Sequence, residues 1–299
     1  MFGAPPDIQT EVFARMPDRF RDPNRESAWT RARGGGPMHS FLEGPAFDRA
    51  GNFYCVDLAH GRIFQISPDR EWHLFAEYEG KPNGLKIHRD GRIFVADAQH
   101  GILCFDPATG ARQTILDSYE GAPLAGPNDL CFADNGDLYF TDPGHSGQSD
   151  LSGRVFRIRT DGSVDLLMHS LPYPNGLVLT PAQDALLVAL TSSLQVSRML
   201  LTSGSFRWRT FLQLSGGLAG PDGMAVDEAS NIAVVHAGFG TVWLFSPIGE
   251  PLARVRSCTG IRTTNCTYDG HNLYITEAEE AAILVARMPT PGRLMFSHR

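Results

Sequence analysis

Asn175-Gly176-Leu177-Val178-Leu179 decides the fold of this chain, because similar stretches recur along almost its whole length. In each copy a polar residue stands at the head of a short apolar strand. A steady period of this size predicts an array of small units that bury their faces against their neighbours. The heads are Glu43, Asn83, Asn128, Asn175, Asp222 and Asn265, at intervals of 40, 45, 47, 47 and 43 residues.

Most repeats also contain the pattern of four antiparallel strands. A tight turn such as Asp90-Gly91 follows the head strand, because glycine takes the positive φ that such turns require. A second strand then ends at Asp97, a third covers Gly101–Phe105, and a fourth precedes the next head. Four antiparallel strands in each repeat are typical of a propeller blade. We therefore predict an all-β fold, a six-bladed β-propeller.

The repeats predict a single domain over residues 1–299, with the six blades in 43–287. The sixth blade lacks an outer strand after Ala282–Arg287, and Glu11–Arg15 has the composition to supply it. An N-terminal strand that joins the last blade would close the ring and remove an exposed edge. Residues 17–42 lie outside the blade pattern, and such a long loop is either a lid over the axial site or a surface excursion.

Composition narrows the class of partner. The formal net charge is −7, so no basic footprint for nucleic acid or for an anionic membrane is expected. No apolar run approaches the roughly 20 residues that span a bilayer, and the first residues lack the pattern of a signal peptide. We therefore expect a cytoplasmic protein of open oligomeric state, with frayed ends around Asp7 and at Phe296–Arg299.

The number of cysteines also favours a cytoplasmic location. Their number is odd, which favours a reducing environment in a chain without a secretion signal. We expect structural thiols, several of them inside strands, with a Cys258–Cys266 disulfide as the alternative. The five residues are Cys55, Cys104, Cys131, Cys258 and Cys266.

The head residues carry the candidate chemistry. In a propeller the first strand of each blade lines the channel, so the heads are expected to face one another at one mouth. Turn formation is the simpler explanation for Asn and Gly at strand starts. It does not account for Glu43, nor for Glu43 and Asp222 meeting near an axis without a cation to offset their repulsion. Two carboxylates with amide oxygens form a hard cage suited to Ca²⁺, Mg²⁺ or Mn²⁺.

Four motifs in blade order resemble the gluconolactonase/regucalcin (senescence marker protein 30) family, whose propeller superfamily includes diisopropyl fluorophosphatase. The resemblance extends roughly from Phe41 to Arg287. It implies hydrolysis of small lactones, with related members cleaving organophosphate P–F bonds. It also implies that Glu43, Asn175 and Asp222 hold the metal and that Asn128 binds metal or substrate. The motifs are Glu43-Gly-Pro, Pro127-Asn128-Asp, Pro174-Asn175-Gly and Pro221-Asp222-Gly-Met.

One position departs from the family pattern. Regucalcin-type members carry an arginine two residues before the third-blade asparagine, where it helps to hold the sugar lactone. Here that position is Gly126. The sequence therefore leaves open which lactone is the substrate.

A mechanism follows from the head residues. We expect one divalent ion, Ca²⁺ first with Zn²⁺, Mg²⁺ or Mn²⁺ as alternatives, to polarise the ester carbonyl and to lower the pKa of a bound water. Asp222 would serve as base or nucleophile, and Glu43 as the charge-compensating ligand. Asn175 and Asn128 would be neutral ligands. The candidate substrate contacts are Asn128, His145 and Asn83.

Other polar residues have simpler explanations. Aspartates and histidines recur near the ends of the second strands, where we expect the aspartates to fix turn backbone and the histidines to form ordinary hydrogen bonds. Glu277–Glu280 is expected to be a solvated acidic turn, with a second, structural Ca²⁺ site as the alternative. The recurring residues are Asp57, Asp97 and Asp142, with His60, His100 and His236.

Three functions are compatible with the sequence. The first is a metal-dependent lactonase that opens a small lactone with activated water. The second is a related hydrolase that uses the same cage on an organophosphate or an enol lactone. The third is a non-enzymatic propeller that binds a ligand or a protein, and the polar, acidic blade starts argue against it.

Overall fold

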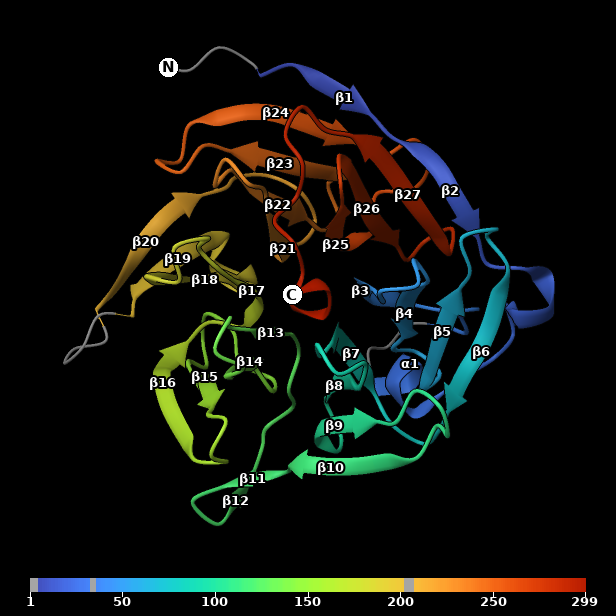
Figure 1. Ribbon diagram of the computed structural model, residues 1–299, viewed down its shortest axis with the longest axis horizontal. Coiled ribbons are helices and arrows are strands. Elements are labelled where there is room, and N and C mark those ends of the chain that lie inside the picture. Colours follow the sequence, from blue (N-terminus) through green and yellow to red (C-terminus); the bar gives the residue numbers. More distant parts are fainter. Residues whose placement is uncertain (1–4, 33–35, 202–206) are drawn as a thin grey trace.

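Six sheets of four or five strands surround a central axis in the computed structural model, which describes residues 5–32, 36–201 and 207–299 (Figure 1). The prediction of an all-β, six-bladed propeller is therefore confirmed. In each blade neighbouring strands among the first four, counted outward from the innermost strand, are antiparallel. The polar head of each sequence repeat stands in an innermost strand, except Asn128, which lies two residues before the innermost strand of its blade.

The elements follow the repeats of the sequence. The first two blades contain β3 (Leu42–Phe47), β4 (Phe53–Asp57), β5 (Arg62–Ile66) and β6 (Trp72–Glu77), then β7 (Pro82–Ile87), β8 (Ile93–Asp97), β9 (Gly101–Phe105) and β10 (Arg112–Leu116). A hairpin of β11 (Ser118–Tyr119) and β12 (Ala122–Pro123) leads to the third blade. That blade contains β13 (Leu130–Phe132), β14 (Leu138–Asp142), β15 (Gly153–Ile158) and β16 (Val164–Leu171).

The second half of the ring repeats this order. The fourth and fifth blades contain β17 (Pro174–Leu179), β18 (Ala185–Leu190), β19 (Gln195–Leu200) and β20 (Trp208–Gln213), then β21 (Pro221–Val226), β22 (Ile232–His236), β23 (Thr241–Phe245) and β24 (Pro251–Arg256). The sixth contains β25 (Thr263–Asp269), β26 (Asn272–Glu277) and β27 (Ala282–Arg287). The short helices are η1 (Asp18–Phe20), α1 (Ala28–Ala32), η2 (Thr191–Ser193) and η3 (Phe296–His298).

The N-terminal segment closes the ring as predicted. β2 (Glu11–Arg15) pairs antiparallel with β27 as the outermost strand of the sixth blade, with Glu11 opposite Val285. β1 (Asp7–Gln9) adds a fifth, parallel strand to the fifth blade by pairing with β24. The expectation of a frayed end around Asp7 is wrong, because its carboxylate also accepts a 2.7 Å hydrogen bond from the Arg254 guanidinium.

Within the described residues the hydrophobic core is divided into six clusters, each between two neighbouring blades. Between the fifth and sixth blades, for example, Val235 and Leu244 are buried with Ile275 and Leu284. Successive side chains of a strand point to opposite faces of its sheet, so each blade contributes to two clusters. A blade therefore buries both faces only when its two neighbours are present.

The segment 17–42 is anchored on the first blade. Arg62 of β5 donates hydrogen bonds to the carbonyl oxygens of Phe20 and His39, at 2.8 and 2.9 Å. The same guanidinium forms a buried ion pair with Asp57, at 2.6 Å. Residues 33–35 lie outside the described part of the chain, and a role of this segment as a lid stays a prediction.

The C-terminal segment crosses the axis at the end opposite the strand starts, where Figure 1 shows the end of the chain at the centre of the ring. The Ser297 hydroxyl donates to the carbonyl oxygen of Phe47, the last residue of β3, at 3.0 Å. Phe296 is 9% exposed and stacks on Phe132, the last residue of β13, with 4.8 Å between ring centroids. The expectation of a frayed end at Phe296–Arg299 is therefore wrong.

All five cysteines are free, four of them buried and Cys258 exposed. The disulfide alternative for Cys258 and Cys266 is therefore wrong. In the parts of the chain that the structure describes, no helix has the length and apolar character needed to cross a membrane. A cytoplasmic location stays a prediction.

Candidate active site

A β-bulge marks the head residue of the innermost strand. In the first blade Glu43 pairs with Val56 and Ala46 pairs with Tyr54, so one extra residue lies between the two pairs. The same bulge occurs at the heads of the second, fourth, fifth and sixth blades. A bulge bends the strand and re-aims its side chains. The side chains of the head residues therefore need not follow the regular alternation between the two faces of the sheet.

Close approach between blades explains the glycine that follows the head. A Cβ atom on Gly176 would lie 2.2 Å from the backbone oxygen of Asp222, the head of the next blade. A Cβ atom on Gly223 would lie 2.0 Å from Oδ1 of Asn265. Neither glycine adopts a positive φ, so the turn explanation does not account for them. The innermost strands converge so closely that only a residue without a side chain fits.

The Glu43 carboxyl group is buried among other acids. Glu43 is 4% exposed, and this burial raises the pKa of its carboxyl group well above the usual value. The charges of Asp222 and Asp129 raise that pKa further, whereas hydrogen bonds from the Gly44 N–H and the Asn265 side chain lower it. A nearby positive charge is what favours the ionised form of such a group.

Asp129 and Asn265 meet across the axis from opposite blades, the third and the sixth. The Asn265 side-chain nitrogen donates to an Asp129 carboxylate oxygen at 3.2 Å, and both residues are buried. Asp129 also pairs with the ammonium group of Lys86, at 3.9 Å. This contact shows that the innermost strands bring side chains of distant repeats together at the axis.

Asp129 and Lys86 are not among the residues that the sequence predicted for the site. Asp129 occupies the position that is glycine in four other repeats, and Lys86 stands in an otherwise apolar inner strand apart from its head. Both departures are visible in the repeat pattern. Their partners are not, because Asp129 gains its contacts from the second and sixth blades.

A hydrogen-bond network orients Asn175. Its Nδ2 donates to the Thr191 hydroxyl oxygen at 3.1 Å, and that hydroxyl donates to the Pro221 carbonyl oxygen at 2.7 Å. Because the amide nitrogen is directed at Thr191, the amide oxygen lies on the other side of the group. That oxygen is the atom suited to a cation.

The remaining predicted contacts differ in burial. Asn83 and Asn128 are buried heads, 9% and 6% exposed. His145 is exposed, on the loop that follows β14. This loop packs beside Gly126, where a Cβ atom would lie 3.5 Å from Cα of Gly144. The structure thus brings the heads together and leaves His145 outside this buried set.

The aspartates that end the second strands fix turn backbone, as predicted. Asp142 accepts hydrogen bonds from the Ala125 and Gly126 N–H groups, at 3.1 and 2.7 Å. Asp57 and Asp97 accept equivalent bonds from the loops that precede their own heads. Each of these carboxylates therefore positions the backbone that leads into a head residue.

The histidines after the second strands also bind loop backbone, as predicted. Glu277 corrects the expectation of a solvated turn, because it is fully buried. Its carboxylate accepts hydrogen bonds from the N–H groups of Glu279 and Glu280, both at 2.8 Å, as the aspartates do in other blades. The histidine contacts join Nε2 to a carbonyl oxygen: His60 to Met38 at 2.7 Å, His100 to Glu79 at 2.7 Å and His236 to Gly216 at 3.1 Å.

The donor set at the heads fits a hard divalent cation. Glu43 and Asp222 bring carboxylate groups, and Asn175 brings an oriented amide oxygen. In the described ranges no group of three or more His, Cys, Asp or Glu side chains is arranged to hold a metal, and the set here mixes acids with amides. The burial of Glu43 beside other acids is the observation that fits a cation.

Comparison with known proteins identifies the family. The family described as SMP-30/gluconolactonase/LRE-like region matches residues 41–279. The gluconolactonase of Zymomonas mobilis is 32% identical, and the match covers 78% of this chain and 75% of that protein. Lactonase drp35 of Staphylococcus aureus is 27% identical, over 72% of this chain and 69% of that protein.

A solved structure agrees with these relatives. A gluconolactonase from Xanthomonas campestris is 25% identical, with a TM-score of 0.74, and the match covers 84% of this chain and 86% of that one. The family match includes the heads of all six blades. The chain therefore belongs to the SMP-30/gluconolactonase/LRE-like family.

Proposed function

We propose that this protein is a lactonase-type hydrolase that opens a small lactone with water and uses one divalent cation. Family membership and the gluconolactonase and lactonase relatives support the lactone hydrolase. The observation that carries the metal dependence is the burial of Glu43 beside Asp222 and Asp129. A cation at this point would offset the repulsion between the acids.

Glu43, Asp222 and Asn175 are the residues that we propose as ligands, with Asn128 as a further neutral ligand. Ca²⁺ is the proposed ion because it accepts carboxylate and amide oxygens in flexible geometry. Zn²⁺, Mg²⁺ and Mn²⁺ are the alternatives. When bound, such an ion polarises the ester carbonyl and lowers the pKa of a coordinated water.

The head residues carry out proton transfer or nucleophilic attack, charge balance and substrate binding. Asp222 accepts the proton of the attacking water, or attacks the carbonyl itself as a nucleophile. Glu43 supplies the second negative charge that balances the cation. Asn128 and Asn83 bind the substrate at the heads of the third and second blades, and His145 contacts it from the exposed loop.

Gly126 stands at the position where regucalcin-type members carry an arginine that helps to hold the sugar lactone. Its φ is +146°, a backbone conformation that a residue with a side chain adopts only under strain. An arginine would require a different path of the loop that leads into Asn128. We therefore propose that the lactone is held by contacts other than this arginine.

The test combines metal analysis with a pH-indicator assay, because opening of a lactone releases acid. We expect the purified protein to contain one divalent ion per chain and to hydrolyse at least one lactone in a panel of aldonolactones and enol lactones. Treatment with EDTA should abolish turnover, and Ca²⁺ or another divalent ion should restore it. Undiminished turnover after complete metal removal would contradict the metal dependence. A metal-loaded protein that hydrolyses only phosphoesters would contradict the lactonase.

A further inference from the structure

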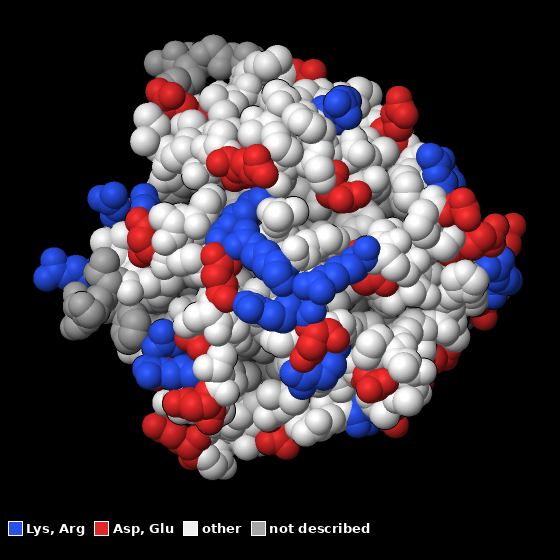
Figure 2. Space-filling model, in the orientation of Figure 1, with Lys and Arg blue, Asp and Glu red and all other residues white. Residues whose placement is uncertain are grey.

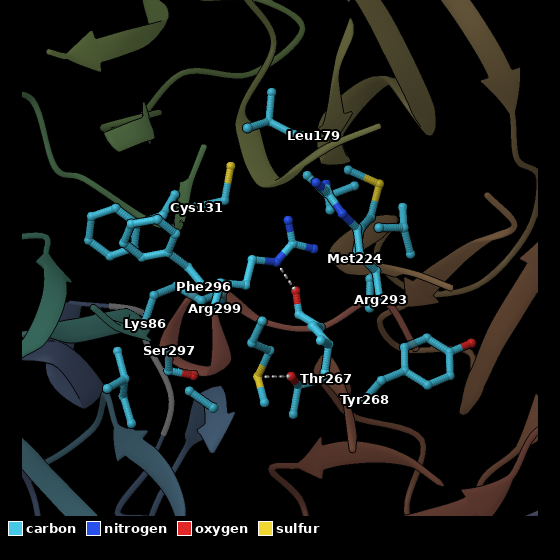
Figure 3. Close-up of a pocket in the computed structure, with 18 of the residues that line it drawn as sticks. Lys86, Cys131, Leu179, Met224, Thr267, Tyr268, Arg293, Phe296, Ser297 and Arg299 are labelled. Atoms are coloured by element: carbon cyan, nitrogen blue, oxygen red, sulfur yellow. Dashed lines mark hydrogen bonds between the residues drawn. The ribbon is translucent and has the colours of Figure 1, made fainter. Parts of the chain in front are cut away.

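A cavity lies at the other end of the axis, under the C-terminal segment. It is partly open, with a volume of about 120 Å³, and Ile87, Leu179 and Val226 at the ends of three innermost strands line it. Figure 3 shows this pocket with Leu179 labelled. The head residues stand at the starts of the same strands. A strand of six residues spans roughly 17 Å. The cavity therefore lies at the opposite end of the axis from the head residues. Lys86 lies between the two, because it lines the cavity and its ammonium group pairs with Asp129 at 3.9 Å.

Positive side chains surround this cavity. Arg293 and Arg299 of the C-terminal segment line it, as does Lys86 of β7. Figure 2 shows Lys and Arg side chains gathered at the centre of this face of the molecule. In Figure 3 the guanidinium groups of Arg293 and Arg299 extend across the pocket from the C-terminal segment.

The negative charge beside these groups is small. Among the described residues, the Asp134 carboxylate pairs with Arg293 at 2.9 Å and with Arg299. Two guanidinium groups offer ten N–H donors in all. Besides their bonds to Asp134, Arg299 donates to the Leu294 carbonyl oxygen at 2.9 Å and Arg293 to the Thr180 carbonyl oxygen at 3.3 Å, which leaves further donors for a ligand. Burial, followed by the charge of Arg299, lowers the pKa of Arg293. Both observations indicate cationic groups that are close together and incompletely compensated.

Apolar side chains form the body of the cavity. Phe132, Val178, Leu179 and Met224 line it. The volume, about 120 Å³, approaches that of an engineered cavity of roughly 150 Å³ that binds benzene. A complementary ligand would have an apolar body of about this size and one anionic group that accepts hydrogen bonds from paired guanidinium donors.

We propose that this cavity binds a small organic carboxylate, with the carboxylate on Arg293 and Arg299 and the apolar body between the ends of the innermost strands. The carboxylate of the ligand would neutralise the positive charge of Arg293 and Arg299 that Asp134 does not neutralise. Phosphate ions share the charge but lack the apolar body, and neutral aromatic molecules share only the body. The proposal does not depend on the lactonase activity.

The test uses the full chain dialysed against EDTA, so that no metal at the heads recruits a carboxylate. Binding of 4-fluorobenzoate is measured by fluorine NMR, with 4-fluorobenzyl alcohol as its neutral counterpart and inorganic phosphate as a competitor without an apolar body. We expect saturable binding of 4-fluorobenzoate that is at least tenfold tighter than binding of the alcohol, as roughly expected for charge-assisted hydrogen bonds. Phosphate should compete only weakly.

Two variants remove the two halves of the proposed site. Arg293→Met removes a guanidinium group, and Val178→Phe fills the cavity from β17 while both arginines stay. Each should weaken binding of 4-fluorobenzoate by about tenfold or more. Arg254→Met, on the fifth blade away from the cavity, is the matched control and should bind normally. Unchanged binding in Val178→Phe, or equal binding of the alcohol by the unaltered protein, overturns the proposal even if Arg293→Met fails to fold.

Discussion

Asp222 is the residue on which the proposed hydrolysis depends most directly. Asp222→Asn keeps the size of the side chain and removes its capacity to accept a proton. We expect kcat for the best lactone to fall by about 10²–10⁴-fold, with the melting temperature of the metal-free protein no lower than before. Asp184→Asn, in an exposed turn of the fourth blade, is the control and should have normal kcat. Near-normal rates in Asp222→Asn would refute the role.

Glu43 gives the metal-free protein a distinctive pH dependence. Its pKa in the folded state is raised above the ordinary value of 4.5 by burial and neighbouring acids. Between these two values the folded protein binds more protons than the unfolded chain, so the free energy of unfolding falls as pH rises. Glu43→Gln removes this loss. In EDTA at pH 8 the variant should therefore melt above the unaltered protein, and the difference should shrink towards pH 4.

Excess Ca²⁺ provides the complementary measurement for Glu43. Binding to the folded state alone raises stability by mass action, so the unaltered protein should gain melting temperature and Glu43→Gln should gain little. The order of the two melting temperatures would then reverse between EDTA and Ca²⁺. A variant that is less stable than the unaltered protein in both solutions would contradict the assignment of Glu43 as a buried, cation-dependent acid.

At the scale of the blade, an acidic residue at the end of the second strand holds the loop before the head. Asp57 accepts the Phe41 N–H at 2.7 Å and pairs with the buried Arg62 guanidinium. Asp57→Asn leaves that guanidinium without its charged partner, which should lower the free energy of unfolding by about 3 kcal/mol. Denaturant titration measures the change. Asp69→Asn, in an exposed turn of the same blade, should stay within about 0.5 kcal/mol, and an equally small effect of Asp57→Asn would contradict the anchor.

Blades could be predicted because each is a local unit with its own turns. The predicted closing strand coincides with β2, and the last predicted strand coincides with β27. The period also placed the heads Glu43 and Asp222 at equivalent points of two blades. Those points follow from spacing alone, without knowledge of what each side chain touches.

Contacts between distant elements could not be predicted in this way. The local sequence of β1 does not reveal that β24 is its partner, and Phe296 is buried because Phe132 of β13 and His88, directly after β7, pack against its ring. Asp129 gains its importance from Asn265 on the opposite blade. The reason for the repeated glycines was also hidden, because it lies in the backbone of the next blade.

At the scale of the whole molecule, the ring depends on its closing strand. Ala14 of β2 is 6% exposed and packs in the cluster between the sixth and first blades. Ala14→Asp buries a charge there and should detach β2, because an unpaired buried carboxylate is costly. We expect a fall in melting temperature, binding of a hydrophobic dye and self-association by size-exclusion chromatography, since the edge of β27 is then exposed.

Glu11→Lys is the matched control for this change, because Glu11 lies on the same strand and is exposed. It should leave the protein monodisperse to the same degree as before and as stable within about 0.5 kcal/mol. If Ala14→Asp behaved like Glu11→Lys, the ring would not need β2 for closure.

The pairing of β2 with β27 also sets the timing of assembly on the ribosome. β2 leaves the exit tunnel early, whereas its partner is made only after five blades have been translated. At about 5–20 residues per second, this delay is on the order of tens of seconds. The first five blades can collapse during that time while β2 is an unpaired strand, open to chaperones and to neighbouring nascent chains. Translation of the last blade therefore controls when the native protein is complete.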